Sequence, residues 1–329
     1  MPTTPTIDLT GATPGWPAHL LQQWRDCLLR TCQEDLPADG APHIGDPELR
    51  AVLADRVGVA ASDLVITSGV RFAVRGLCAD ADRVVVERPT FSGVPLSLTQ
   101  LGLPWSYADW AEMLAGDRTV EGAVCWVTSP ARNPDGRGFG TADLARWAAV
   151  AGSARRLVQN VTYRDFADGP AIPGACLVAS FHKVAGPGAR LGWAAGPGMA
   201  ELLKPELRAA SPARIWQRTW LRFVLSGGWD ELTTGLRADV ERARSAFRAG
   251  LGPALEWLAP DLACGAGPAL LLRAAASDAR DRLAAAGVLV GAGADFAAGN
   301  RMVRVWLAGL TEDAAFTAAQ RVGRVLAHR

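Results

Sequence analysis

The chain has 329 residues, of which 49% are hydrophobic and 20% are charged, and its formal net charge is +1. This length and composition allow a large buried core, in one large and one smaller domain, and exclude an intrinsically disordered chain. The balanced charge, without a clustered basic stripe, argues against nucleic acid as the main partner.

Short apolar runs alternate with helical patterns through the first two thirds of the chain. We expect strands in residues 63–69, 82–89, 122–130, 155–160 and 174–181. Helical patterns follow the first three of them, in residues 70–79, 95–102 and 141–152. The strands are rich in β-branched residues and continuously apolar, as is typical of parallel strands buried on both faces. The pattern predicts an α/β domain with a mostly parallel sheet between helices.

The last third of the chain has a different pattern. Residues 213–258 are helical over most of their length, with a break at Gly227 and Gly228. Strand-like segments and two helices follow, which indicates an α+β unit. The predicted organisation is therefore an N-terminal arm (1–44), a large α/β domain (45–205), a helical connector (206–255) and a small α+β domain (256–329).

The cysteines and the apolar segments indicate the compartment. The six cysteines, at positions 27, 32, 78, 125, 176 and 264, have no paired spacing for zinc and are too sparse for a disulfide framework. No apolar run reaches the roughly 18 residues of a membrane span, and the first residues lack a signal-peptide pattern. We expect a soluble, cytoplasmic protein without a metal site or a membrane partner.

Lysine is scarce in this chain. Only Lys183 and Lys204 occur among the 34 basic residues. A lysine cannot be replaced by arginine where a primary amine must lose its proton and form a carbon–nitrogen double bond, because a guanidinium stays charged. Lys204 is typical of a solvated helix residue. Taken alone, Lys183 fits either a Schiff-base lysine or a surface lysine beside a Gly-Pro turn.

Two motifs bear on the role of Lys183. In SFHKVAGPGARLGW (180–193), Ser180 precedes the lysine by three residues and Arg190 follows it by seven. In VITSGVRF (65–72), a strand runs through a Ser-Gly turn into a helix, so the backbone amides there point out of a helix N-terminus. That geometry binds phosphate, although many plain strand-to-helix turns share the sequence.

Four further segments combine with these motifs: ERPTFSG, SPARNPDG, RRLVQNVTYRDF and GNRMVRVWLAG. Together the segments resemble the aspartate aminotransferase superfamily of pyridoxal phosphate enzymes (fold type I, class I/II aminotransferases), over essentially the whole chain. The resemblance implies an α/β large domain with a mostly parallel, seven-stranded-type sheet and a smaller α+β C-terminal domain. It also implies pyridoxal 5′-phosphate as the cofactor, a small-molecule amino acid as the substrate, and a homodimer.

The resemblance further implies roles for single residues. Lys183 would be the Schiff-base lysine and, once released by substrate, the general base at Cα. Residues that would bind the cofactor phosphate are Gly69, Val70, Arg71, Ser180 and Arg190. Residues that would contact the cofactor ring are Phe91, Asn133, Asn160 and Tyr163. Arg304 would bind the substrate α-carboxylate through a bidentate pair, with Arg301 as a weaker candidate.

Asn160 departs from the family pattern, which has aspartate three residues before the tyrosine. An aspartate beside the pyridine nitrogen keeps it protonated, and a pyridinium withdraws electrons from a broken bond at Cα. Asparagine carries no charge, so the ring should be a weaker electron sink and transamination less favoured. The alternative is that the strand is misaligned and that Asp165 or Asp168 supplies the acid.

A tyrosine is also missing. The family has one before the G-x-x-x-LR segment, where it reaches the phosphate of the neighbouring subunit, but no tyrosine precedes Tyr107 here. His43 could replace it or could be an ordinary loop histidine.

The sequence therefore predicts a pyridoxal phosphate enzyme that acts at Cα of an amino acid, of aminotransferase type. Asn160 keeps open a non-transaminating enzyme that catalyses β- or γ-elimination, replacement or cyclisation. A third possibility is a catalytically reduced cofactor-binding module, against which the intact Lys183, Ser180, Arg190 and Asn133 count.

Overall fold

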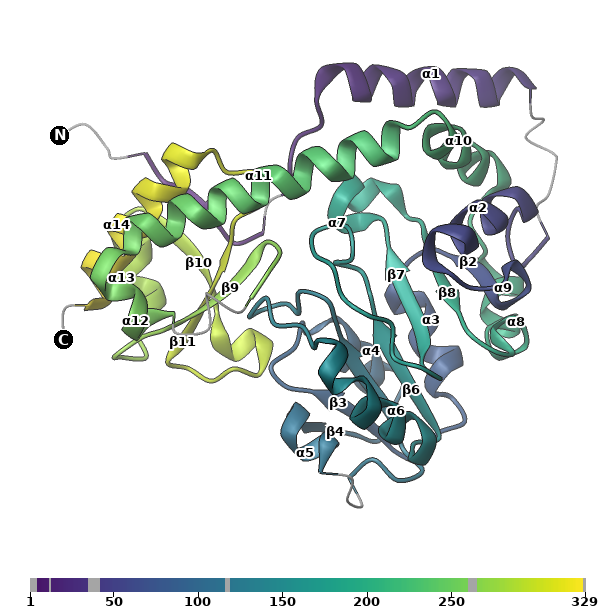
Figure 1. Ribbon diagram of the computed structural model, residues 1–329, viewed down its shortest axis with the longest axis horizontal. Helices are drawn as coiled ribbons and strands as arrows, with labels where there is room; N and C mark the ends of the chain where they lie inside the picture. The colour runs from purple at the N-terminus through teal and green to yellow at the C-terminus, as the bar shows by residue number, and fades with distance from the viewer. Residues whose placement is uncertain (1–4, 12, 35–41, 116–118, 260–264, 328–329) are drawn as a thin grey trace.

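A computed structural model describes residues 5–11, 13–34, 42–115, 119–259 and 265–327. Cys264 and parts of the expected N-terminal arm lie outside these ranges. The chain forms a seven-stranded sheet and a separate four-stranded sheet, which the long helix α11 (Gly228–Leu251) connects (Figure 1). This arrangement confirms the expected α/β class with a larger and a smaller part.

The seven-stranded sheet has the order β2-β8-β7-β6-β5-β3-β4. Its strands are β2 (Leu64–Thr67), β3 (Val84–Glu87), β4 (Trp105–Ala108), β5 (Val124–Thr128), β6 (Arg156–Asn160), β7 (Cys176–Ser180) and β8 (Gly192–Ala195). Neighbouring strands pair in parallel except at β8, which is antiparallel to both β2 and β7. The carboxyl ends of β2, β3, β5, β6 and β7 therefore meet at one edge.

Helices cover both faces of this sheet. The helices of the large part are α1 (Ala18–Glu34), α2 (Pro47–Val57), α3 (Val70–Cys78), α4 (Gly93–Gln100), α5 (Trp110–Leu114), α6 (Leu144–Ser153), α7 (His182–Ala185), α8 (Met199–Leu202), α9 (Lys204–Ala210) and α10 (Arg214–Leu225). One face packs against α3, α4, α8 and α9, and the other against α1, α2, α7, α10 and α11 at one side and α5 and α6 at the other.

Alternate residues of each strand belong to opposite faces. In β3, Val84 and Val86 pack in one cluster and Val85 in the other. Both sets are buried, which explains why the sequence shows continuous apolar runs rather than alternation. The antiparallel strand β8 and the edge strand β4 were not expected from the sequence. Both are four residues long, and Gly-Trp-Ala-Ala in β8 has low β-propensity.

Gly192 in β8 lies where two backbones approach closely. A Cβ at this position would be 2.3 Å from the carbonyl oxygen of Ala179 and 2.8 Å from Cα of Gly69. Because both neighbours are backbone atoms, Gly192→Ala should destabilise the fold by roughly 1–3 kcal/mol. Urea unfolding measures this, with Gly140→Ala as the control, because a Cβ on Gly140 would meet no atom within 4 Å. An equal loss in both variants would contradict the close-approach explanation.

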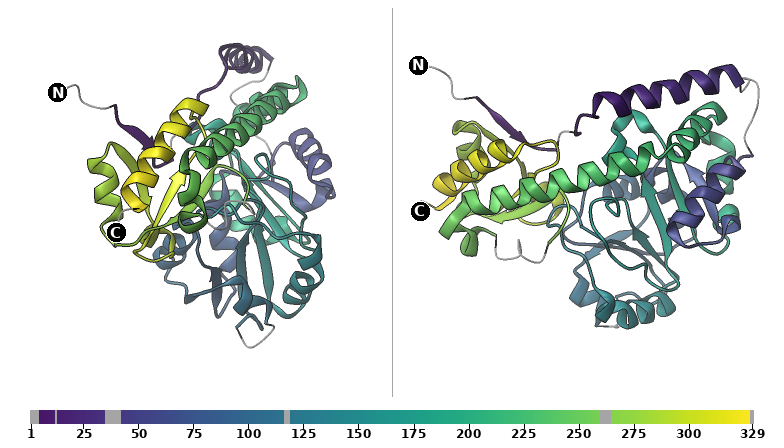
Figure 2. Two further views of the ribbon diagram at one scale, coloured as in Figure 1. Left: turned by 60° about the vertical axis from the view of Figure 1, so that its left-hand side comes forward. Right: turned by 45° about the horizontal axis from the view of Figure 1, so that its top comes forward.

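The four-stranded sheet has the order β1-β10-β11-β9. Its strands are β1 (Ile7–Leu9), β9 (Ala269–Arg273), β10 (Val288–Ala292) and β11 (Met302–Trp306), and its helices are α12 (Leu255–Leu258), α13 (Ala279–Ala285) and α14 (Glu312–Ala327). Helix α14 packs along α11 (Figure 2). β1 pairs in parallel with β10, so residues 7–9 belong to the small sheet although the sequence placed them in an arm. The proposed domain boundaries stay predictions.

The described residues show neither a membrane-spanning helix nor a cluster of metal ligands. No helix there is long and apolar enough to cross a membrane. No group of three or more histidine, cysteine, aspartate or glutamate side chains in the same ranges could hold a metal ion.

Candidate active site

A cavity of about 510 Å³ lies at the edge where the parallel strands end. It is lined by every residue that the sequence assigned to catalysis or cofactor binding: Gly69, Val70, Arg71, Phe91, Asn133, Asn160, Tyr163, Ser180, Lys183 and Arg190. They come from different loops and strand ends. Thus segments that are far apart in sequence converge where open α/β sheets bind their ligands.

The first end of the cavity is a cup around the N-terminus of α3. The N-cap residue of this helix is Gly69, with φ +121°. Because glycine has no side chain, it cannot cap the first amides of the helix. Ser180 comes close, since its Oγ would be 3.2 Å from a Cβ on Gly69. The Arg190 guanidinium is exposed and has no hydrogen-bond or ion-pair partner within the described ranges. The Gly69 amide donates to Oγ1 of Thr67 at 3.2 Å, so the amides of Val70 and Arg71, with the hydroxyl and the guanidinium, are the groups that fit a phosphate.

Lys183 projects from the short helix α7 toward two aromatic rings. Its Nζ lies 5.3 Å from the ring centroid of Phe91 and 5.4 Å from that of Trp306. Its neighbour His182 also lines the cavity, and its pKa is lowered by burial and by the positive charges of Lys183, Arg71 and Arg190. Among the described residues that line the cavity, none has a carboxylate side chain.

The other end of the cavity holds amide and phenol groups. Asn133 donates from Nδ2 to the hydroxyl of Tyr163 at 3.2 Å, and its Oδ1 is buried without a partner in the described chain. Asn160 accepts a bond from the backbone N–H of Thr162 at its Oδ1, at 3.1 Å. Because only an oxygen can accept this bond, the amide orientation is set, and Nδ2 of Asn160 remains as a donor.

The two aspartates that could have been the missing acid lie elsewhere. Asp165 lines a separate cavity of about 130 Å³ with Arg56 and Trp229, and burial raises its pKa to about 6. Asp168 is exposed and forms an ion pair with Arg237 at 2.6 Å. Neither residue lines the 510 Å³ cavity. The structure thus places Asn160, and no aspartate of this segment, at the cavity wall.

Arg304 is buried on β11, outside the set of residues that line the cavity. Its guanidinium carbon lies 5.4 Å from the ring of Trp306, the same ring that Lys183 approaches. Nε and Nη1 have no hydrogen-bond partner among the described residues, and burial lowers the pKa of this arginine. A buried guanidinium with free donors fits a carboxylate. Arg301 is exposed at the turn before β11.

Several residues of the cavity wall were not predicted from the sequence, including Thr162, His182, Trp126 and Thr128. Thr162 is only 6% exposed, and its hydroxyl has no partner in the described part of the chain. In the sequence, only the position of Thr162 between Asn160 and Tyr163 indicates that it lines the cavity. His43 is exposed and does not line the cavity of its own chain.

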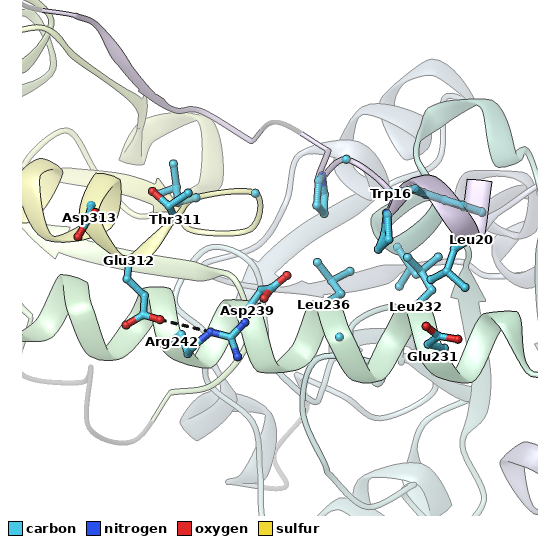
Figure 3. Close-up of a pocket in the computed structure, with 17 residues that line it drawn as sticks. Trp16, Leu20, Glu231, Leu232, Leu236, Asp239, Arg242, Thr311, Glu312 and Asp313 are labelled. Atoms are coloured by element: carbon cyan, nitrogen blue, oxygen red, sulfur yellow. Dashed lines mark hydrogen bonds and ion pairs between the residues drawn. The ribbon is translucent and has the colours of Figure 1, made fainter. Parts of the chain in front are cut away.

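A second cavity, of about 790 Å³, lies along α11 (Figure 3). One half is apolar, with Trp16, Leu232 and Leu236, and the other half holds Arg242, whose Nε is 3.4 Å from Glu312. None of the predicted site residues lines it. Arg242 is already paired with the carboxylates of Asp239 and Glu312. The smaller cavity of about 510 Å³ is therefore the candidate active site.

Comparisons with known proteins concern the fold. No protein-family model matches the chain, and a search of curated proteins finds no match. Among solved structures, a double mutant of Thermus thermophilus aspartate aminotransferase has a TM-score of 0.83 and 24% identity over 98% of this chain and 92% of that chain. The chain therefore has the aspartate aminotransferase fold, as the sequence resemblance implied.

Two other solved structures have the same fold. An α-aminoadipate aminotransferase from Thermus thermophilus, complexed with N-(5′-phosphopyridoxyl)-L-leucine, has a TM-score of 0.82 and 19% identity over 98% of this chain and 92% of its own. Tyrosine aminotransferase from Leishmania infantum has a TM-score of 0.81 and 16% identity over 99% of this chain and 93% of its own.

Proposed function

We propose that the protein is a pyridoxal phosphate-dependent enzyme of aminotransferase type that acts at Cα of an amino acid. The observation that carries this proposal is the position of Lys183. One of only two lysines in the chain, it lies in the same cavity as a phosphate-type cup and a paired amide and phenol. The solved structures with this fold include aspartate, α-aminoadipate and tyrosine aminotransferases.

The residues of the cavity fit the cofactor. The α3 N-terminus, Ser180 and Arg190 would hold its phosphate, and the buried, unpartnered Oδ1 of Asn133 marks a polar position that a ligand can satisfy. When bound, pyridoxal phosphate supplies an aldehyde that captures amino groups and a ring that accepts electrons from bonds at Cα. Phe91 would cover the ring, and Asn133 with Tyr163 would bind its phenolic oxygen.

The substrate would be held by this chain's own cations. Arg304 would take the α-carboxylate, which would satisfy its free Nε and Nη1. The amine of Lys183 would then remove the proton from Cα, since no carboxylate among the described lining residues can act as the base.

Reconstitution with pyridoxal phosphate tests the proposal. The purified protein should acquire the visible absorbance of a lysine-bound cofactor, and a panel of amino acids with a 2-oxo acid should change that absorbance and yield a new amino acid. Binding without any response to the panel would favour a cofactor-binding module instead. Absence of binding would overturn the proposal.

Asn160 favours a second candidate, an enzyme of this fold that does not transaminate. Its Oδ1 is occupied by the N–H of Thr162, so a donor and no negative charge would face the ring nitrogen. A cofactor ring without that proton would accept electrons less well, which would favour elimination, replacement or cyclisation over amino-group transfer.

Restoring the acid tests this second candidate. Asn160→Asp should increase the proton affinity of the ring nitrogen and raise the yield of amino-group transfer from ordinary amino acids. A buried carboxylate can cost several kcal/mol, but the N–H of Thr162 would support one oxygen. The measurement is the ratio of transamination to ammonia-releasing turnover in the wild type, in Asn160→Asp and in Asn160→Ala as a control that removes the donor. A wild type that transaminates at ordinary rates would contradict it.

The homodimer is also a proposal. His43 is exposed, as a residue that reaches a neighbouring subunit must be. His43→Ala should weaken cofactor binding only in the dimer, which sedimentation and cofactor titration at matched concentrations would measure.

A further inference from the structure

Two buried charged residues lie beside the cavity without lining it. Glu87, the last residue of β3, is 0% exposed, and Arg132 is 2% exposed. Nη1 of Arg132 lies 3.7 Å from Oε2 of Glu87. Buried charges of this kind persist only when they are paired and hydrogen-bonded. The proposed chemistry uses neither of them.

Their neighbours hold both side chains in place. Trp110 donates from Nε1 to Oε2 of Glu87 at 2.6 Å, and its ring lies 4.2 Å from the guanidinium carbon of Arg132. Nε of Arg132 donates to Asp135 at 3.0 Å. Removing Arg132 would leave the buried charge of Glu87 without its ionic partner, whereas removing Glu87 would leave Arg132 held by Asp135 and the Trp110 ring.

Each member is next to a residue of the cavity wall. Arg132 directly precedes Asn133 and bonds through its backbone to Gly136 and Arg137, so its side chain and main chain both fix the loop 129–137. Glu87 begins the segment that continues to Phe91, and Nη1 of Arg132 reaches the carbonyl oxygen of Arg88 at 3.5 Å. The pair thus ties together the two loops that carry Asn133 and Phe91.

We propose that Glu87 and Arg132 form a positioning pair that fixes the orientation of Asn133 toward Tyr163, and thereby sets how the site holds the phenolic end of the cofactor ring. This inference rests on the proposed function for its meaning. Its first test, however, needs no cofactor, because Asn133 and Tyr163 are already bonded in the protein alone.

The positioning pair should respond to pH. Burial raises the pKa of Glu87 to about 7, while the charge of Arg132 and the polar groups of Thr128 and Trp110 oppose that rise; Oε1 of Glu87 has no hydrogen-bond partner among the described residues. These three residues face Glu87 from loop 129–137, β5 and α5, and Arg132 is the charged one among them. As pH falls through about 7, Glu87 becomes neutral and Arg132 keeps only Asp135 as its ionic partner.

The chain has only two tyrosines, Tyr107 and Tyr163. The NMR signal of Tyr163 can therefore be resolved, and it reports on the positioning pair through Asn133. In cofactor-free protein labelled with [¹³Cζ]tyrosine, Tyr107→Phe assigns the signal of Tyr163. We expect that signal to shift in Glu87→Gln and Arg132→Met. In wild type it should also move with pH around a midpoint near 7, and Glu87→Gln should remove this step. A matched control is Arg156→Met, which breaks a partly buried ion pair with Asp80 at the opposite end of the sheet.

A second measurement is the affinity for pyridoxal phosphate, which should fall about tenfold in both pair variants, equivalent to about 1.4 kcal/mol, and stay unchanged in the control. An unshifted Tyr163 signal in folded variants, or a pH step that survives in Glu87→Gln, would overturn the positioning role. If Arg132→Met does not fold, the Tyr163 signal in the isosteric Glu87→Gln and the pH series of the wild type still test the positioning role. If wild type binds no cofactor, the proposed function fails while the resonance test still judges the positioning pair.

Discussion

Replacing Lys183 with arginine is expected to abolish covalent attachment of the cofactor and to lower turnover by at least about 10³-fold. A guanidinium remains protonated, so it can neither form a carbon–nitrogen double bond with an aldehyde nor accept the Cα proton, and loss of a general base alone costs about 10²- to 10⁴-fold. Borohydride reduction followed by peptide mapping should place the phosphopyridoxyl label on Lys183 in wild type and nowhere in the variant.

The chain provides a matched control for this experiment. Lys204→Arg changes the only other lysine, which is half-buried in α9 and bonded to Glu201 at 2.8 Å. It should keep both the label and the turnover. A label on Lys204, or an unlabelled wild type that is shown to hold cofactor, would overturn the assignment of the site.

Replacing Arg304 with alanine or lysine is expected to weaken binding of α-amino acids by about 2–5 kcal/mol, roughly 30- to 5,000-fold. The guanidinium is buried with Nε and Nη1 free of partners in the described chain, so the substrate carboxylate would replace no existing partner of those atoms. Lysine would lose the planar fork and with it the bidentate geometry. Titration of cofactor-loaded protein with an unreactive amino acid analogue measures the change.

Cofactor content should not change in either variant, because Arg304 does not line the cofactor cavity. Arg301→Ala is the control, since this arginine is exposed three residues earlier. A variant of Arg304 that fails to fold or loses cofactor would show that the residue is structural. An equal effect at Arg301 would show that the carboxylate site is misassigned.

The sequence predicted which segments line one cavity because each of them carries a recognisable local pattern at a strand end. The serine and arginine around Lys183, the Asn-Pro turn at Asn133 and the Ser-Gly turn before α3 are local patterns, and the order of a parallel sheet brings them to one edge. The residues that line the cavity could be predicted from the strands that end at the same edge, without knowing the distances between the side chains.

The features that the sequence did not reveal depend on the geometry of individual side-chain contacts. Whether Arg304 is buried or solvated is decided by Phe296, at 4.8 Å, and Trp306. The orientation of the Asn160 amide depends on a backbone N–H two residues away, and the Glu87–Arg132 pair joins two loops that are distant in sequence. β8 was not predicted because it begins with Gly192, which is placed by the close approach of the Gly69 and Ala179 backbones and not by strand propensity.

The pairing of β1 with β10 makes the smaller sheet discontinuous in sequence, because its edge strand comes from the beginning of the chain and its other strands from the end. The polypeptide consequently crosses between the two sheets twice, once between β1 and α1 and once along α11. The two parts are therefore joined by two covalent connections, and hydrogen bonds from the Thr90 N–H to the carbonyl oxygen of Phe296 and from the Ala266 N–H to that of Gly136 join them as well. A fragment that begins at residue 256 would lack both connections, since α11 ends at Leu251, and it would also lack the edge strand β1, leaving the amide and carbonyl groups of β10 open to pairing with another chain.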